Sequence, residues 1–219
     1  MSNPFLKKDS VGYFIQHEFG DLRPDFLVGP NYLRPIKKGK EELIAKAMGI
    51  QKGFGHVWDL TAGLLEDSVF LARLGFHVLA LERNSTIFEV MNSSLQSSLK
   101  KIANSPVDSN RFKYLHNISL ENTDSIEFLS KNVCPPGCSI YIDPMFPDKK
   151  KSALPRKEMR IFKEIVGADE DGLKLLEVSL QSGCKRVIVK RPLKAAPLIE
   201  KVNHSFKGTS IRYDLYLKT

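Results

Sequence analysis

Short apolar segments alternate with helix-forming segments from residue 56 onward, and this alternation constrains the fold more than any other feature. The segments that read as strands are residues 56–60, 76–81, 112–116, 139–142 and 185–190. The helical segments between them are residues 67–74, 84–103, 119–131, 155–166 and 170–182. Such alternation is typical of a doubly wound α/β sheet with mostly parallel strands. We therefore expect a ligand to bind at the carboxyl ends of the strands.

The two ends of the chain depart from this alternation. A short helix is expected over residues 195–202, and residues 204–206 and 211–217 predict a terminal antiparallel hairpin. Residues 1–35 carry a Gly/Pro-rich stretch between short apolar pieces. We expect residues 1–38 to form an arm or small hairpin extension and residues 39–219 to form the main domain.

Polar residues follow four of the predicted strands. Asp59 and Gly63 come after the first strand, Glu82 ends the second, Ser119 follows the third and Asp143 ends the fourth. Because the carboxyl ends of parallel strands meet at one edge of a sheet, these residues predict a nucleoside cleft in which Glu82 binds the two ribose hydroxyls. Taken singly, Asp59 or Glu82 would more simply cap a helix or balance surface charge. Their shared order along the sheet favours the cleft.

The ligand expected in this cleft carries no phosphate. The chain has no GxGxxG motif, so its first helix offers no phosphate cradle. An acidic lining around a glycine turn suits a ligand with a positive centre. S-adenosylmethionine, which has a sulfonium and an ammonium group, meets both conditions and is the predicted cofactor.

The segment Asp143-Pro144-Met145-Phe146-Pro147 places an acid, a proline and an aromatic ring at the end of the fourth strand. The Asp143 carboxylate and a backbone carbonyl fixed by Pro144 can accept hydrogen bonds from an amino group, and the Phe146 ring can stack on a flat heterocycle. Together they can hold a nucleobase by its exocyclic amine. We interpret Asp143, Pro144 and Phe146 as catalytic residues for methylation of such an amine.

Basic residues gather directly after the Asp143 loop. The formal net charge of +8 fits either solubility or a nucleic-acid partner. In a helix beginning near Pro155, the side chains of Arg156, Arg160 and Lys163 share one stripe, which we interpret as a phosphate-binding surface. Further positive charge is expected on the same rim from the end of the fifth strand. The predicted nucleic-acid contacts are Lys149, Lys150, Lys151, Arg156, Lys157, Arg160, Lys163, Lys190 and Arg191.

Several protein classes are disfavoured. No run of about 18 apolar residues predicts a transmembrane helix, and the amino terminus lacks the apolar core of a signal peptide. Cys134, Cys138 and Cys184 have no paired CxxC spacing and read as small buried hydrophobes. The histidines form no ligand spacing, so we expect no metal, and no serine lies in the nucleophile elbow of a hydrolase. We expect a protein of the reducing cytoplasm.

Several segments together resemble the ribosomal RNA small subunit methyltransferase J family. They are the Asp143 segment with its basic tail, residues 59–64, Leu81-Glu82-Arg83-Asn84 and residues 185–192, and the likeness covers roughly residues 39–217. The resemblance implies a Rossmann-like class I methyltransferase domain with a mostly parallel seven-stranded sheet and a C-terminal antiparallel hairpin. It also implies methylation of the exocyclic N2 amine of a guanosine in 16S ribosomal RNA, with the RNA or the small subunit as partner.

The resemblance further implies cofactor contacts, with two departures from the family pattern. The contacts would be made by Glu66, Asp67, Glu82, Arg83, Ile118, Ser119 and Asp143. The family usually reads Gly-Leu-Gly-Arg-Asp where this chain has residues 63–67, with Leu65 in place of the second glycine and Glu66 in place of the arginine. We expect Leu65 to cost backbone freedom and to add bulk beside the ligand. Ile118 stands where the family has a serine and leaves only a main-chain contact.

Two other functions stay open at this point. Leu65 and Glu66 are compatible with an RNA-binding or assembly factor that has weak catalytic activity. An amino methyltransferase acting on DNA adenine or on protein glutamine would use the same acid-proline-aromatic segment. The sequence leaves open which guanosine is modified, whether the substrate is naked or assembled RNA, and the oligomeric state.

Overall fold

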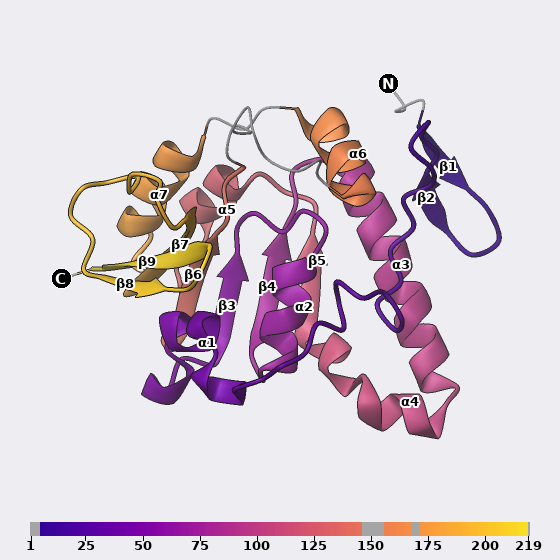
Figure 1. Cartoon of the computed structure of the whole chain (residues 1–219), viewed down its shortest axis with the longest axis horizontal. Helices are drawn as coiled ribbons and strands as arrows, with labels where there is room; N and C mark the ends of the chain where they lie inside the picture. Colours follow the sequence, from indigo (N-terminus) through magenta and orange to yellow (C-terminus); the bar gives the residue numbers. More distant parts are fainter. Residues whose placement is uncertain (1–4, 146–155, 168–170, 219) are drawn as a thin grey trace.

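The computed structural model describes residues 5–145, 156–167 and 171–218, and a seven-stranded sheet forms its centre (Figure 1). The strands are β3 (His56–Asp59), β4 (His77–Leu81), β5 (Ile118–Glu121), β6 (Cys138–Ile142), β7 (Arg186–Pro192), β8 (His204–Lys207) and β9 (Ile211–Leu217). Their spatial order is β5-β4-β3-β6-β7-β9-β8. The first five in this order are parallel, whereas β9 pairs antiparallel with both β7 and β8. The predicted α/β sheet with a terminal hairpin is confirmed.

Helices cover both faces of the sheet. The α-helices are α1 (Leu43–Met48), α2 (Glu66–Arg73), α3 (Ser85–Ala103), α4 (Pro106–Arg111), α5 (Ser125–Lys131), α6 (Lys157–Val166) and α7 (Gly172–Gln181). Short 3-10 helices are η1 (Gly39–Glu41), η2 (Ile50–Lys52) and η3 (Lys113–Asn117). Helix α6 lies near the carboxyl ends of the strands, beside α3 (Figure 1). Within the described ranges, no helix combines the length and apolarity needed to cross a membrane.

Both faces of the sheet are apolar, as expected for parallel strands that are covered on each side. Val57 in β3 and Tyr141 in β6 pack with α1, α2 and α3, in the larger of two cores. Their neighbours Trp58 and Ile140 point to the opposite face and pack with α5 and α7. Successive side chains of a strand point to opposite faces of the sheet, so neighbouring residues of one strand join different cores.

Helix α3 begins where the sequence predicts. The Asn84 side-chain oxygen accepts hydrogen bonds from the backbone N–H groups of Thr86 and Ile87, both at 3.1 Å. Such a cap satisfies two of the N–H groups that a helix leaves unpaired at its start. The cap also fixes the chain direction shortly after Glu82, which directly follows β4.

Three elements differ from the sequence predictions. The helix expected over residues 119–131 begins only at Ser125, because residues 119–121 belong to β5. The strand expected at residues 112–116 is wrong, because η3 occupies this region and β5 begins only at Ile118. Phe112 and Leu115 are buried three residues apart, a helical spacing that a short apolar run hides. The helix expected at residues 195–202 is also wrong, since turns and bends are found there. Pro197 supplies no backbone N–H donor and disfavours a helix in this stretch.

The amino-terminal segment forms a small hairpin of β1 (Leu6–Lys8) and β2 (Tyr13–Ile15). The Tyr13 backbone N–H donates to Ser93 Oγ of α3 at 2.9 Å. Farther along, Phe26 and Tyr32 are buried in the larger core of the sheet. The division at residue 38 stays a prediction, and the segment before it shares its core with the segment after it.

Candidate functional site

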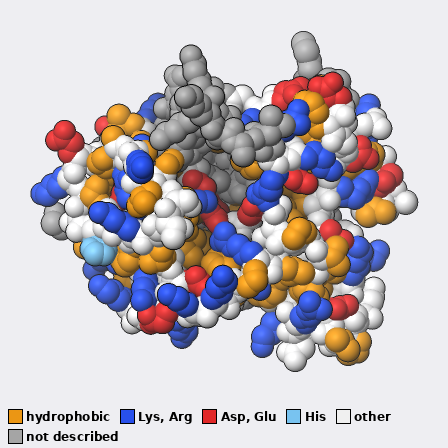
Figure 2. Space-filling view, viewed as in Figure 1, with side chains coloured by type: hydrophobic (Ala, Val, Ile, Leu, Met, Phe, Trp, Pro, Cys, Tyr) orange, Lys and Arg blue, Asp and Glu red, His pale blue; other side chains and the backbone are white. Residues whose placement is uncertain are grey.

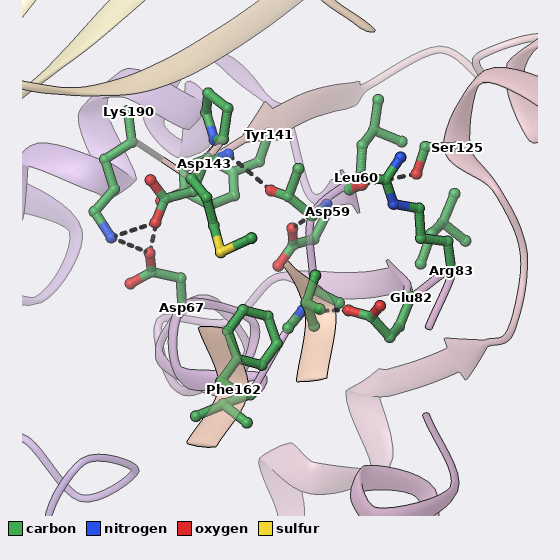
Figure 3. Close-up of a pocket in the computed structure, with 18 of the residues that line it drawn as sticks. Asp59, Leu60, Asp67, Glu82, Arg83, Ser125, Tyr141, Asp143, Phe162 and Lys190 are labelled. Carbon is green, nitrogen blue, oxygen red and sulfur yellow. Dashed lines mark hydrogen bonds and ion pairs between the residues drawn. The ribbon is translucent and has the colours of Figure 1, made fainter. Parts of the chain in front are cut away.

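A cavity of about 430 Å³ lies at the carboxyl ends of β3, β4, β6 and β7. In the space-filling view, acidic and basic side chains meet at the centre of this face, below the residues drawn in grey (Figure 2). The volume is within the range of small-ligand pockets, about 300–1,000 Å³. Among the predicted site residues, the lining includes Asp59, Gly63, Glu66, Asp67, Glu82, Arg83, Asp143 and Pro144 (Figure 3). The structure therefore brings these eight predicted residues, from both the cofactor-binding and the catalytic sets, into one cavity.

Glu82, at the end of β4, is buried and holds the turn after β3. Its Oε2 accepts a hydrogen bond from the Gly63 backbone N–H at 3.0 Å, and its Oε1 accepts one from the Asn84 N–H at 2.7 Å. Gly63 has a φ of 49°, and a Cβ atom there would lie 3.2 Å from the ring of Phe162 in α6. The turn therefore favours glycine both for its backbone conformation and for the close approach of α6.

Asp59, the last residue of β3, is also buried. One carboxylate oxygen accepts a hydrogen bond from Ser68 Oγ at 2.5 Å, and the other accepts one from the Thr61 N–H at 3.1 Å. Burial raises the pKa of Asp59 to about 7, even though these two hydrogen bonds act to lower it. Asp59 thus connects β3, the glycine turn and α2 at the floor of the cavity.

Asp143, directly after β6, shares a cation with Asp67 of α2. Lys190 Nζ lies 2.8 Å from Asp143 Oδ2 and 2.7 Å from Asp67 Oδ2 (Figure 3). Burial and the charge of Asp67 raise the pKa of Asp143, and the Lys190 ammonium opposes them. Burial would also raise the pKa of Asp67, but Lys190 and Arg34 outweigh it and hold that pKa below its usual range. Lys190 therefore stabilises the Asp67 carboxylate, and at Asp143 it opposes the rise in pKa that burial causes.

Two predicted cofactor residues at the cavity mouth form ion pairs. Glu66 accepts from Arg156 Nη2 at 3.0 and 2.9 Å, which connects the start of α2 to α6. Arg83 donates to Asp171 Oδ2 at 2.8 Å and connects the end of β4 to the segment before α7. These pairs lie on two sides of the same cavity.

Comparison with known proteins identifies the family. A family model described as "Putative SAM-dependent methyltransferase" matches residues 14–218. A ribosomal RNA small subunit methyltransferase J from Bdellovibrio bacteriovorus is 40% identical over 191 residues, which cover 85% of this chain and 70% of the relative. One from Pectobacterium atrosepticum is 39% identical over 203 residues, covering 91% and 79%. The chain belongs to the ribosomal RNA small subunit methyltransferase J family.

A solved structure supports the same assignment of fold. A SAM-dependent methyltransferase from Neisseria gonorrhoeae superposes with a TM-score of 0.70 at 27% identity, covering 100% of this chain and 85% of that one. The predicted family, the class I methyltransferase fold and S-adenosylmethionine as cofactor are thereby confirmed.

The cavity fits S-adenosylmethionine. Its volume suits a nucleoside-sized ligand, and its acidic lining suits the sulfonium and ammonium charges. Glu82 lines this cavity, and a carboxylate oxygen is a suitable acceptor for a ribose hydroxyl. Glycine at position 63 leaves room beside Phe162 that a larger residue would fill.

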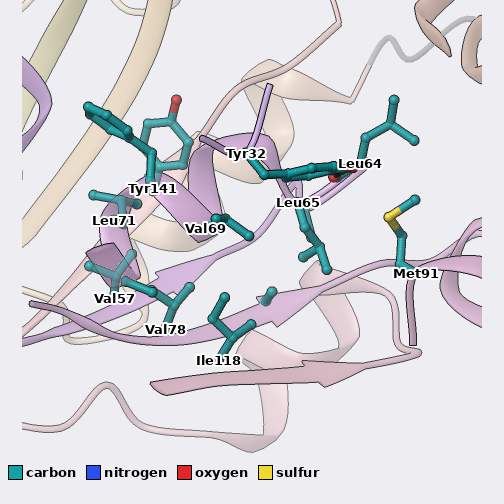
Figure 4. Packing of buried hydrophobic residues seen from close by; sticks show 14 of the residues in the cluster. Tyr32, Val57, Leu64, Leu65, Val69, Leu71, Val78, Met91, Ile118 and Tyr141 are labelled. Atoms are coloured by element: carbon teal, nitrogen blue, oxygen red, sulfur yellow. Dashed lines mark hydrogen bonds between the residues drawn. The ribbon is translucent and has the colours of Figure 1, made fainter. Parts of the chain in front are cut away.

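Leu65, the residue that departs from the family's glycine, does not add bulk to the cavity. It has a φ of 59°, in the left-handed region that leucine disfavours, so the predicted backbone cost is present. Its side chain is fully buried and points toward the sheet, into the core that contains Val78 and Ile118 (Figure 4). The expectation of bulk beside the ligand is therefore wrong, because the left-handed backbone turns this side chain into the core.

Leu65→Gly and Leu65→Ala separate the cost of the left-handed backbone at position 65 from the gain of burying the leucine side chain. Both variants lose the buried side chain, which we expect to lower the free energy of unfolding by about 2–5 kcal/mol. Leu65→Gly is expected to be more stable than Leu65→Ala by about 1 kcal/mol, because only glycine escapes the left-handed penalty. Urea unfolding of the three proteins measures this order. Alanine being the more stable of the two would contradict the strained backbone.

Ile118 and Ser119 lie away from the cavity. They occupy the start of β5, and Ser119 pairs with Leu79 inside the sheet rather than following a strand end. The prediction that Ser119 follows the third strand is wrong because that strand starts six residues later than expected. The corresponding wall of the cavity is formed by Asp124, Ser125 and Ile126.

The described basic residues near α6 have partners within the protein. Besides the Arg156 ion pair, Lys157 Nζ donates to the Asp21 carbonyl at 3.0 Å, and the Arg160 guanidinium lies 3.6 Å from the centre of the Phe19 ring. Lys163 lines the cavity. The charged face of α6 therefore packs partly against the amino-terminal segment. Met159 and Phe162 of the same helix form part of the cavity wall.

Lys190 and Arg191 differ from their expected role on an RNA-binding rim. Lys190 points into the cavity between two carboxylates. Arg191 is buried and donates to the Ala196 carbonyl. Both side chains therefore bind oxygen atoms of the protein itself.

Four predicted site residues lie outside the described residues. They are Phe146, Lys149, Lys150 and Lys151. Among the residues that the structure describes, no cluster of three or more His, Cys, Asp or Glu side chains is arranged to hold a metal ion.

Sequence reasoning missed Arg34 and Tyr32, which come from the amino-terminal segment. Arg34 lines the cavity and donates to Asp67 Oδ1 at 3.0 Å. The Tyr32 hydroxyl donates to the Leu64 carbonyl at 3.0 Å and supports the glycine turn. No local motif marks either residue, because their role arises only from packing across the fold.

Proposed function

We propose that this protein methylates the exocyclic N2 amine of a guanosine in the RNA of the small ribosomal subunit, with S-adenosylmethionine as the methyl donor. Membership of a family whose relatives are named ribosomal RNA small subunit methyltransferase J supports the RNA substrate. One observation supports the site: Glu82 and Asp143 line the same cavity, so a nucleoside pocket adjoins an acid suited to binding an amine.

The chain's own residues supply orientation and charge. When bound, S-adenosylmethionine supplies a methyl group on a positively charged sulfur, which keeps the electron pair of the broken carbon–sulfur bond. Asp143 and the carbonyl of Pro144 accept hydrogen bonds from the N2 amine, whose lone pair is delocalised into the ring, and favour a more pyramidal nitrogen. The nitrogen gains the methyl carbon and loses one proton to solvent. Proximity and a nearby carboxylate account for most of the acceleration.

The acceptor base must leave any helical stack to enter the cavity. In a duplex the N2 amine is hydrogen-bonded to the paired base and its faces are covered by stacked neighbours, whereas the amine must approach an acid that lines a cavity. Arg156, Lys157, Arg160 and Lys163 are proposed to contact phosphates next to that base. Their contacts with Glu66, Asp21 and Phe19 hold α6 beside the cavity.

A methyl-transfer assay tests the proposal. The substrates are small subunits and deproteinised RNA from a strain lacking the gene, with labelled S-adenosylmethionine and nucleoside analysis of the product. We expect label in N2-methylguanosine, and comparison of the two substrates tells whether naked or assembled RNA is used. Label in methyladenosine, in DNA or in protein would overturn the proposal, and absence of transfer despite cofactor binding would favour an assembly factor.

The role of α6 predicts a change in salt dependence. Each phosphate contact with single-stranded RNA contributes about 0.7 to the slope of log affinity against log salt. Arg160→Ala and Lys163→Ala are each expected to reduce that slope by about this amount and to weaken binding at low salt. Lys100→Ala, an exposed position near the end of α3, is the matched control and is expected to bind normally. Unchanged slopes in both α6 variants would place the RNA elsewhere.

A further inference from the structure

Lys190 lies beside Asp143 because of strand register. Val189 in β7 pairs with Ile142, the last residue of β6. The residues that follow them in the chain, Lys190 and Asp143, are therefore also neighbours. Ile188 packs on the α2 side of the sheet, and Lys190 has the same parity. The ammonium group therefore points toward α2, whose Asp67 receives it.

Asp67 is a rigid anchor for this ammonium group. In addition to Lys190, it accepts a hydrogen bond from the Tyr141 hydroxyl at 2.6 Å and one from Arg34 Nη2 at 3.0 Å. Its side chain is 11% exposed. The Arg34 guanidinium is itself stacked 3.7 Å from the centre of the Phe70 ring. Lys190 is thus held by Asp67 as well as by Asp143.

Asp143 has one oxygen occupied and one available. Its Oδ2 accepts from Lys190, while Oδ1 accepts no hydrogen bond from any residue in the described ranges. Its backbone N–H donates to Thr61 Oγ1 at 2.7 Å, which fixes the main chain. The side chain is 33% exposed, so the second oxygen can reach a ligand.

We propose that Lys190 is a positioning residue, which uses Asp67 as its anchor and fixes one oxygen of Asp143 so that the other oxygen receives the acceptor amine. This inference rests on the proposed function, because it assigns the amine to Asp143. It replaces the phosphate-binding role expected from the sequence, since contact with RNA would require the ammonium group to leave two carboxylates in a largely buried site.

The charges around Asp143 give this role a pH signature. The titratable groups that face Asp143 are Asp59, Asp67, Tyr141, Lys190 and Tyr213. Of these, only Lys190 lowers the pKa of Asp143, against burial and Asp67, which raise it. Asp143 acts as a carboxylate, so activity falls as pH drops through its pKa. Removing Lys190 raises that pKa further and moves the acidic limb to higher pH.

The experiment compares Lys190→Met with Lys190→Arg. We expect Lys190→Met to lower kcat by about 10- to 100-fold and to shift the acidic limb of the kcat profile upward. The KM for RNA and the calorimetric Kd for S-adenosylmethionine should change by less than about threefold. Lys190→Arg keeps the charge and should restore the acidic limb. Lys185→Met removes an exposed charge at the other end of β7 and should behave as the unmodified protein.

A second pair of variants tests the same role if Lys190→Met does not fold, because that variant leaves two neighbouring carboxylates without their shared cation. Asp67→Asn and Asp67→Asn/Lys190→Met differ only in Lys190, and the double variant removes one charge of each sign. Carbon-13 NMR of the Asp143 carboxylate then reads its titration without substrate. The double variant is expected to titrate Asp143 at higher pH than Asp67→Asn and to turn over more slowly.

Two results would overturn the role of Lys190. One is an unchanged kcat in Lys190→Met with weaker RNA binding and a smaller salt slope, which would make Lys190 a phosphate contact. The other is an unchanged Asp143 titration in both comparisons. Failure of the proposed function would look different, because the unmodified protein would then yield no N2-methylguanosine while the NMR titration still reported the Lys190 contact.

Discussion

Asp143→Asn is expected to lower the turnover number for RNA methylation by about 10²- to 10³-fold, the usual effect of removing one group that stabilises developing charge. The substitution keeps the shape of the side chain but removes its negative charge. The amine nitrogen becomes more positive as it gains the methyl group, so the lost carboxylate matters more in the transition state than in the bound complex. Single-turnover methylation under saturating conditions measures the effect.

Measurements of ligand affinity distinguish a loss of turnover in Asp143→Asn from a loss of binding. The Kd for RNA is expected to stay within about threefold of that of the unmodified protein, so the loss lies in turnover. Glu121→Gln removes an exposed acid at the end of β5, on the same edge of the sheet, and serves as the control. Normal turnover by Asp143→Asn would remove this residue from the chemistry, whereas equal losses in the control would indicate a general charge effect.

Glu82→Ala is expected to weaken S-adenosylmethionine binding by about 100-fold. The variant loses charge-assisted hydrogen bonds to the ribose, each worth about 1.5–3 kcal/mol. It also frees the N–H groups of Gly63 and Asn84, which the carboxylate now fixes at the turn and at the start of α3. Isothermal titration calorimetry measures the loss.

Glu82→Gln is the matched comparison for this effect. Its amide keeps one acceptor oxygen, so an intermediate loss of about tenfold is expected. RNA affinity should not change in either variant, because Glu82 is buried at the end of β4. Cofactor binding by Glu82→Ala with normal affinity would show that this acid only shapes the turn.

The strands were predictable wherever apolar runs are bounded by turns. β3, β4, β6 and β7 follow such runs, and the terminal hairpin follows from two runs around Lys207-Gly208. The third strand was misplaced because residues 112–116 are apolar enough for a strand but bury Phe112 and Leu115 at helical spacing. A run of five residues is too short for its period to decide between the two.

Part of the cavity lining was also predictable from the positions of the strands. Acids at strand ends reach one edge whenever the strands are parallel, so Asp59, Glu82 and Asp143 could be grouped without coordinates. Lys190 was assigned to RNA because its position next to Asp143 depends on the register between β6 and β7. Arg34 has no such signal, since it reaches Asp67 from a segment outside the sheet.

The sequence alone determined the alternation of strands and helices, the acids at three strand ends and the family, because these depend on local patterns of side chains. Only the tertiary structure decided how the charges are used. It paired Lys190 with Asp67 and Asp143, turned Leu65 into the core and brought Arg34 to the cavity. The physical reason is that the effect of a charge or a strained backbone depends on its neighbours in space, and those neighbours lie far away along the chain.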